Sequence, residues 1–225
     1  MPTVPTVPTV PSGSALRLPF AAVVFDCDGV LVDSFVAVER AWDQLARELG
    51  LPSDELLATI HGVRAEDTLR RWVVPDRLEA ALSRLEVLEL EAARTAQPIA
   101  GARELVAALD GVRWGVATSG SRVLAVALLR ACGFHEPGVL VAADDVERGK
   151  PHPDPYLAAA AGLGVPPEEV VVFEDSPTGA EAARVAGSTV VAVATSFPPV
   201  TFPARATVRD LLGVAVEPGT LVIGG

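Results

Sequence analysis

The chain has 225 residues, half of them hydrophobic, which is enough for one large core or for a core domain with a smaller insertion. Its formal net charge of −11 disfavours a protein that binds the phosphate backbone of nucleic acids, so we expect no nucleic-acid partner. The sequence contains neither the run of ~20 apolar residues that a membrane span requires nor a secretory signal. We therefore expect a cytoplasmic protein without a membrane partner, in which Cys27 and Cys132 are reduced packing thiols.

The first 17 residues contain Pro-Thr-Val three times, followed by Pro-Ser-Gly-Ser. Such a segment has little varied apolar surface to pack, and its prolines block regular strand pairing. Residues 1–17 are therefore predicted to be a flexible, extended tail. An inert tail is favoured over an arm that binds a partner.

The apolar run from Phe20 to Val24 predicts a buried strand, and Asp26-Cys27-Asp28-Gly29 follows it directly. The carboxyl ends of strands form the ligand-binding crevice of an open parallel sheet. Two carboxylates one residue apart repel each other there unless a cation or a proton compensates them, so a divalent metal is expected. An isolated Asp-x-Asp is usually a solvated turn, but the strand before it and the Asp33-Ser34 pair after it favour a site.

Residues 35–97 are predicted to form a helical insertion, because they show almost no alternation of apolar and polar residues. Asp33 or Ser34 is expected to cap its first helix, which ends at Gly50. Further helical patterns cover residues 55–60, 65–72 and 76–95.

From Gly101 the pattern alternates between helix and strand, which indicates crossover units on a parallel sheet. The predicted helices are residues 102–109, 122–131, 156–161 and 178–186, and the predicted strands are residues 112–117, 139–142, 170–173 and 189–194, with 206–208 as a candidate edge strand. The expected fold is an α/β doubly wound parallel sheet, made of residues 18–34 and 98–225, with residues 35–97 inserted as a helical cap.

Three later loops at the same expected sheet edge carry polar residues of different kinds. Thr118-Ser119-Gly120-Ser121 opens a helix, where it forms either an anion-binding turn or an ordinary helix cap. Lys150 is the only lysine in the sequence and lies between Gly149 and prolines; a surface position is the alternative to a role in the site. Glu174-Asp175-Ser176 follows the strand 170–173, and Ser176 is a plausible helix cap.

Two acidic pairs, a hydroxyl turn and one ammonium at one edge match the needs of phosphoryl transfer. Carboxylates hold Mg²⁺, and the metal and a lysine neutralise the phosphoryl oxygens.

These four motifs, in this order, resemble those of the haloacid dehalogenase-like phosphohydrolases, and the position of the insertion resembles the subclass with a small helical cap. The resemblance covers residues from Phe20 to about Phe197 and implies a Rossmann-like core. It implies that Asp26 is the nucleophile, which forms an aspartyl-phosphate, and that Asp28 acts as general acid and then as general base.

The same resemblance implies Mg²⁺ as the cofactor. The side chains of Asp26 and Asp175 and the backbone carbonyl of Asp28 would hold it, with Glu174 close by. The phosphoryl oxygens would be held by the remaining motif residues, Thr118, Ser119 and Lys150.

Departures from neighbouring branches of the family narrow the expected reaction. The dehalogenase branch lacks the second aspartate, which is Asp28 here, and the phosphonate-cleaving branch needs a cap lysine, which residues 35–97 lack. The β-phosphoglucomutase-like group has a histidine where this sequence has Val38 and an arginine where it has Ala65. These two differences weaken the case for a mutase.

The motifs look most like those of the sugar-phosphate and glycerol-phosphate phosphatases, with His61 and Arg64 as cap contacts to the substrate. We therefore expect a phosphatase that acts on a small phosphorylated sugar or polyol. The alternatives are a phosphosugar mutase and a regulatory module that binds phosphate without turnover. The sequence does not fix the oligomeric state, although a monomer is favoured.

Overall fold

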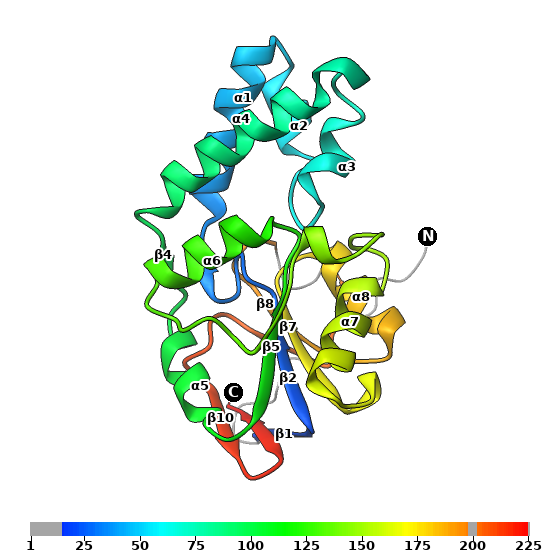
Figure 1. Cartoon of the computed structure of the whole chain (residues 1–225). Helices are drawn as coiled ribbons and strands as arrows, with labels where there is room; N and C mark the ends of the chain where they lie inside the picture. The colour runs from blue at the N-terminus through cyan, green and yellow to red at the C-terminus, as the bar shows by residue number, and fades with distance from the viewer. Residues whose placement is uncertain (1–14, 198–201, 225) are drawn as a thin grey trace, which may run out of the picture.

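The computed structural model describes residues 15–197 and 202–224. In this part of the chain, six parallel strands form the central sheet, in the order β6-β5-β2-β7-β8-β9 (Figure 1). They are β2 (Ala22–Phe25), β5 (Arg113–Ala117), β6 (Val139–Val141), β7 (Val170–Glu174), β8 (Thr189–Val193) and β9 (Ala206–Val208). The predicted α/β fold is confirmed, and so is the edge strand at residues 206–208.

The strand β2 lies at the centre of the sheet, between β5 and β7. All four of its residues are buried, because helices cover both faces of the sheet, and such strands read as continuous apolar runs. The chain moves outward from β2 in both directions, so the strand order reverses there. Ligands of doubly wound folds bind outside the carboxyl ends of strands at this kind of reversal.

Two helices cover each face of the sheet (Figure 1). On one face are α5 (Ala102–Ala108) and α6 (Arg122–Ala131), and on the other are α7 (Asp154–Leu163) and α8 (Pro177–Ala186). Leu105 and Leu128 pack with Phe25 on the first face, while Tyr156 and Ala183 pack with Val24 on the second. The alternation of side chains along β2 thus joins two separate clusters of buried residues.

Four helices between β2 and β5 stand beyond the carboxyl edge of the sheet, at the top of Figure 1. They are α1 (Phe35–Leu49), α2 (Ser53–Leu57), α3 (Ala65–Leu69) and α4 (Pro75–Ala93), and we call them the cap. The cap has its own buried cluster, which includes Trp42, Leu45 and Leu85. The strands β3 (Val32–Asp33) and β4 (Gln97–Pro98) pair antiparallel, so the two connections between cap and core lie side by side.

The predicted helix over residues 65–72 is shorter in the structure and ends at Leu69. Residues 70–72 form a turn, and Val74 is extended before α4 because the residue before a proline is restricted to extended conformations. The other predicted helices and strands are present, with their ends shifted by up to three residues.

A second, antiparallel sheet lies at the end of the core away from the cap (Figure 1). It consists of β1 (Leu16–Pro19), β11 (Thr220–Ile223) and β10 (Val214–Glu217), in that order. The predicted tail boundary at Arg17 is therefore wrong by at least two residues, because Leu16 and Arg17 pair with β11. The rest of the predicted tail, residues 1–14, lies outside the described residues.

Both cysteines are buried and free, as predicted. Nowhere in the described ranges is there a helix with the length and apolar character needed to cross a bilayer.

Candidate active site

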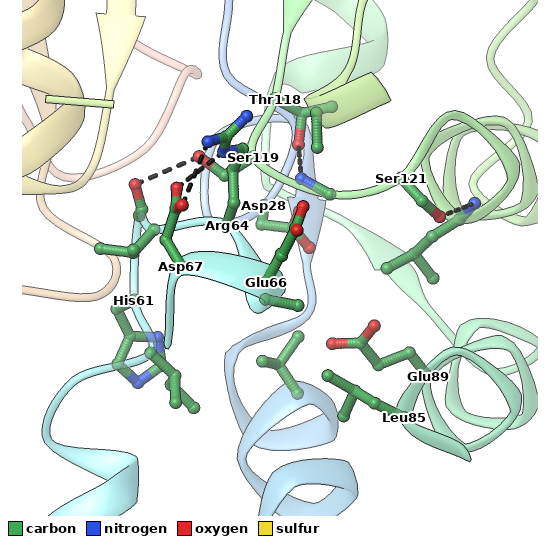
Figure 2. A pocket seen from close by; sticks show the side chains of 18 of the residues that line it. Asp28, His61, Arg64, Glu66, Asp67, Leu85, Glu89, Thr118, Ser119 and Ser121 are labelled. Carbon is green, nitrogen blue, oxygen red and sulfur yellow. Dashed lines mark hydrogen bonds and ion pairs between the residues drawn. The ribbon is translucent and has the colours of Figure 1, made fainter. Parts of the chain in front are cut away.

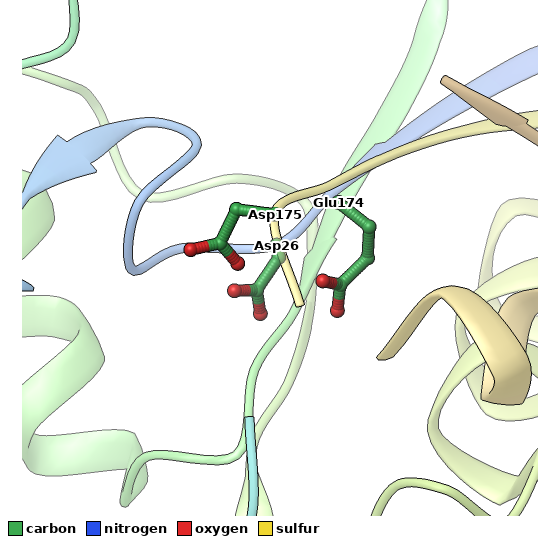
Figure 3. Close-up of side chains that lie close together, drawn as sticks. All are labelled: Asp26, Glu174 and Asp175. Carbon is green, nitrogen blue, oxygen red and sulfur yellow. The ribbon is translucent and has the colours of Figure 1, made fainter. Parts of the chain in front are cut away.

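Three carboxylates from two neighbouring strands meet at the carboxyl edge of the sheet (Figure 3). Phe25 of β2 is in register with Phe173 of β7, so the next residues, Asp26 and Glu174, lie side by side and Asp175 follows. All three are buried, and each offers a carboxylate oxygen within 4.8 Å of the others. The sequence motifs thus converge at one place, as their positions after parallel strands predicted.

Lys150 brings its ammonium group into this cluster from the loop before α7. Its Nζ donates to Asp26 Oδ1 at 2.7 Å and to Glu174 Oε1 at 2.6 Å, and the side chain is buried. Burial alone would lower the pKa of Lys150, but the Asp26 and Glu174 carboxylates raise it well above its ordinary value. Lys150 therefore stays charged and keeps one N–H for a ligand.

Glu174 is held by donors on both of its oxygens. Oε1 also accepts from the Tyr156 hydroxyl at 2.8 Å, and Oε2 accepts from the Ser176 backbone N–H at 2.9 Å and the Ser176 hydroxyl at 3.0 Å. Burial would raise the pKa of Glu174, yet Lys150 and these donors lower it below its ordinary value. These contacts hold Glu174 in place, so that its carboxylate can position Lys150. The role of Tyr156 was not predicted, although a buried tyrosine generally needs a partner for its hydroxyl.

Asp26 and Asp175 differ from Glu174 because few donors compensate their charge. Burial, opposed by Lys150 and helped by the Glu174 and Asp28 carboxylates, raises the pKa of Asp26 to about 7. Burial and the neighbouring carboxylates Glu174 and Asp26 raise the pKa of Asp175 well above its ordinary value. A hard divalent cation with oxygen ligands would offset this repulsion, so the donor set fits Mg²⁺.

The turn after β2 approaches this cluster closely. Gly29 has a φ of 74°, and a Cβ on it would lie 2.0 Å from Asp175 Oδ2. Only glycine therefore fits there without moving the carboxylate. On its other side Asp175 accepts a hydrogen bond from the Ser196 hydroxyl, a contact 21 residues along the chain that no local motif announces.

Asp28 lies half-buried at the edge of the cluster. Burial raises its pKa, and the Ser34 hydroxyl donates to its Oδ1 at 2.5 Å. We expected Asp33 or Ser34 to cap helix α1. Ser34 occupies the cap position, but neither residue's side chain caps the helix, and the Ser34 hydroxyl contacts Asp28 instead.

The hydroxyl groups in the turn after β5, residues 118–121, make different hydrogen bonds. Thr118 Oγ1 accepts from the Gly120 N–H at 3.1 Å, which leaves its O–H free to donate to a ligand. Ser119 donates to the backbone oxygen of Gly62 in the cap at 3.1 Å. Ser121 caps α6 by accepting from the Leu124 N–H at 3.3 Å, which is the ordinary helix cap that was the alternative for this turn.

A cavity of about 680 Å³ lies between this edge of the sheet and the cap (Figure 2). Asp26, Asp28, Thr118, Ser119 and Asp175 line its core side. The cap side includes the predicted contacts His61 and Arg64, together with residues that sequence reasoning missed: Trp42, Glu86 and Glu89. The helical pattern over residues 76–95 predicted this helix but gave no reason to single out its glutamates.

His61 and Arg64 both line the cavity, but protein groups already engage them. The His61 ring stacks on Phe35 with centroids 4.3 Å apart, and burial lowers its pKa. Arg64 forms an ion pair with Asp67 and donates to two core carbonyls, those of Val146 at 3.2 Å and Glu147 at 3.1 Å. These contacts favour a role for Arg64 in joining the cap to the core, and direct substrate contact by either residue stays a prediction.

Comparison with known proteins agrees with this geometry. Residues 20–187 match the haloacid dehalogenase-like hydrolase family. Hexitol phosphatase A of Escherichia coli is 42% identical over an alignment of 175 residues that covers 76% of this chain and 81% of the relative. Glycerol-1-phosphate phosphohydrolase 2 of Saccharomyces cerevisiae is 32% identical over an alignment of 194 residues that covers 81% of this chain and 78% of the relative.

A similar arrangement is found among solved structures. A hydrolase from Pseudomonas syringae superposes with a TM-score of 0.79 at 25% identity, covering 85% of this chain and 94% of the other. The match to the family spans most of this chain, from β2 to the end of α8. The chain therefore belongs to the haloacid dehalogenase-like hydrolase family.

Proposed function

We propose that the protein is a Mg²⁺-dependent phosphatase that hydrolyses small phosphorylated sugars or polyols. The observation that carries the proposal is the convergence of Asp26, Asp28, Asp175 and Lys150 at the carboxyl edge of the sheet, beside the cavity under the cap. The names of the relatives support it, since one is a phosphatase of hexitols and another acts on glycerol 1-phosphate.

Asp26 is the proposed nucleophile. Its carboxylate attacks phosphorus, so that an Asp26 O–P bond forms while the bond from phosphorus to the leaving oxygen breaks. The phosphoryl oxygens accept hydrogen bonds from the Lys150 ammonium and the Thr118 hydroxyl, both of which keep a free donor. Lys150 holds Asp26 by one N–H, which aims the nucleophile at the cavity.

Asp28 is the proposed general acid and base. Burial raises its pKa, which favours the protonated form needed to give a proton to the leaving alkoxide. In the second step the Asp28 carboxylate takes a proton from water, which attacks phosphorus and releases Asp26 and inorganic phosphate. The hydrogen bond from Ser34 fixes the orientation of Asp28 in both steps.

The side chains of Asp26 and Asp175 and the backbone carbonyl of Asp28 would hold Mg²⁺, with Glu174 beside them. The ion supplies positive charge that neutralises the phosphoryl oxygens. The cap would close over the substrate and exclude water that is not positioned by Asp28. The division of the chain into a catalytic core and a cap that closes over it is part of this proposal.

The test replaces the nucleophile. Asp26→Asn should abolish Mg²⁺-dependent release of phosphate from glucitol 6-phosphate and glycerol 1-phosphate, while circular dichroism reports an intact fold. The matched control is Asp33→Asn, an exposed aspartate in the same segment, which should keep the wild-type rate. Substantial phosphate release by folded Asp26→Asn would refute the assignment. Conversion of a hexose 1-phosphate to a 6-phosphate without phosphate release would identify a mutase instead.

A further inference from the structure

Helix α4 contributes two half-buried carboxylates to the cap side of the cavity, Glu86 and Glu89, which we call the acidic wall. Residues three apart on a helix lie on the same side, so both glutamates face the cavity together. Figure 2 shows the Glu89 carboxylate pointing away from α4 into the cavity, on the side of Ser121 and Leu85.

Each carboxyl of the acidic wall is oriented by one donor. Glu89 Oε1 accepts from the Trp42 indole N–H at 3.2 Å, and Glu86 Oε1 accepts from the Ser121 hydroxyl at 3.0 Å. A carboxylate has about four lone-pair sites, so both groups keep acceptor capacity for a ligand. Glu174, buried in the core beside Asp26, by contrast receives donors on both oxygens.

The charge around the acidic wall is negative. The arginines among the described lining residues are Arg64 and Arg70, and each is already paired, with Asp67 and Glu66 respectively. Burial and the Asp28 carboxylate raise the pKa of Glu89 to about 8, because a negative charge is unfavourable at this position. A second anionic group on a substrate would meet the same burial and the same repulsion.

We propose that Glu86 and Glu89 select the substrate class: they bind the hydroxyls of an uncharged, polyhydroxylated leaving group and disfavour one that carries a second anionic group. The inference rests on the proposed phosphatase function and refines its substrate. A hydroxyl both donates and accepts, so it pairs with either protonation state of a carboxyl group. A carboxylate or a second phosphate on the leaving group has no free cation on the cap side to neutralise it.

The acidic wall also bears on the alternative reaction. A mutase that moves a phosphoryl group between two hydroxyls of one sugar passes through a bisphosphate. The second phosphate of such an intermediate would face Glu86 and Glu89, so the wall favours hydrolysis over transfer.

The experiment uses two substrates of the same carbon number that differ at the end far from the phosphate. Glucitol 6-phosphate carries a hydroxymethyl group there, and 6-phosphogluconate carries a carboxylate. The quantity measured is the ratio of their kcat/KM values, because a ratio cancels any loss of catalytic power common to both. The wild-type protein should prefer glucitol 6-phosphate by on the order of 10²-fold, since like charges across an interface are strongly unfavourable.

In the double variant Glu86→Gln with Glu89→Gln, assayed at about pH 9, above the pKa of Glu89, the ratio should fall by about tenfold or more, since amides keep the size and hydrogen bonding but not the negative charge. Glu79→Gln is the matched control, an exposed glutamate on the same helix outside the cavity, and should keep the wild-type ratio. If the double variant fails to fold, Glu86→Gln alone should still lower the ratio by about threefold.

An unchanged ratio in the folded variants would overturn the inference, as would a wild-type protein that turns over both substrates equally. In either case hydrolysis of glucitol 6-phosphate would leave the phosphatase assignment standing. If the wild type released phosphate from neither substrate nor from p-nitrophenyl phosphate, the proposed function would fail first and the inference with it.

Discussion

The core side and the cap side of the active site differ in how fully their carboxylates are hydrogen bonded. On the core side, behind Asp26, a buried network is formed by Lys150, Glu174, Tyr156 and Ser176, in which Glu174 at the end of β7 accepts hydrogen bonds from the other three. At the cap end, the acidic wall has one oriented bond per carboxyl, on a domain joined to the core by short strands. We infer from this difference that the core holds the groups for phosphate chemistry and that the cap selects the leaving group.

The largest expected effect comes from breaking the core network at Lys150. Lys150→Met removes the ammonium and leaves Asp26 and Glu174 buried without it. We expect kcat to fall on the order of 10²-fold or more, because a preorganised charge partner is lost. Unfolding in urea should show a loss of about 3–5 kcal/mol, as for other broken buried ion pairs.

The control for this variant is Arg148→Met, two residues away, where an exposed arginine pairs with Asp154 on the surface. It should leave kcat within about twofold of wild type. A near-normal rate in Lys150→Met would mean that the buried network is structural only.

The next effect concerns the carboxylates and Mg²⁺. Folding raises the pKa of Asp26 from about 4 to about 7, so the protonated form favours the folded state. Its contribution to stability is complete below about pH 4 and is lost as the pH rises through about 7. Mg²⁺ binds the ionised form, so it should raise the melting temperature more at about pH 8 than at about pH 5.5.

At a Mg²⁺ concentration near 100 times its dissociation constant, the gain should be about 2.7 kcal/mol, or roughly 5–10 °C in a chain of this size. Differential scanning fluorimetry measures it, and Asp175→Asn should remove most of the shift. Equal shifts at both pH values would show that the ion does not compete with protons at this cluster.

The smallest expected effect comes from Arg64, and it distinguishes a role in joining the cap to the core from a role in binding substrate. Its guanidinium joins Asp67 in the cap to the carbonyls of Val146 and Glu147 in the core. Arg64→Ala should therefore lower kcat/KM by about tenfold for glucitol 6-phosphate and for p-nitrophenyl phosphate alike, through weaker closure of the cap. The exposed cap residue Arg77 gives the control, Arg77→Ala. A loss confined to the polyol phosphate would instead show that Arg64 contacts the substrate.

Much of the fold could be predicted because local signals agreed with the tertiary structure. The fully buried β2 appears in the sequence as a continuous apolar run. Asp26 follows β2 and lies beside Glu174 of β7, because the carboxyl ends of parallel strands share one edge of the sheet. Lys150 could also be predicted as a site residue, because it is the only lysine in the sequence and lies between a glycine and prolines. The hairpin β10–β11 was missed even though Pro218-Gly219 between two apolar segments is a turn signal.

The remaining parts of the site depend on contacts that no local pattern encodes. Ser34 stands where a helix cap is expected, and only the folded turn brings its hydroxyl to Asp28. Ser196, in the loop after β8, reaches Asp175 at the end of the neighbouring strand β7. Glu89 looks like any polar residue on a long helix until Trp42 of α1 and the cavity orient it.

The central claim is that the Asp26 carboxylate takes the phosphoryl group, and the most direct test is to trap it there. Asp28→Asn lacks the proposed base, but an aryl phosphate needs little help from an acid to leave, so the covalent intermediate should accumulate. We predict that Asp28→Asn, quenched in acid during turnover of p-nitrophenyl phosphate, carries one phosphoryl group on the peptide that contains Asp26. Phosphate found on another residue, or turnover by a protein in which Asp26 is replaced by Asn, would contradict the account.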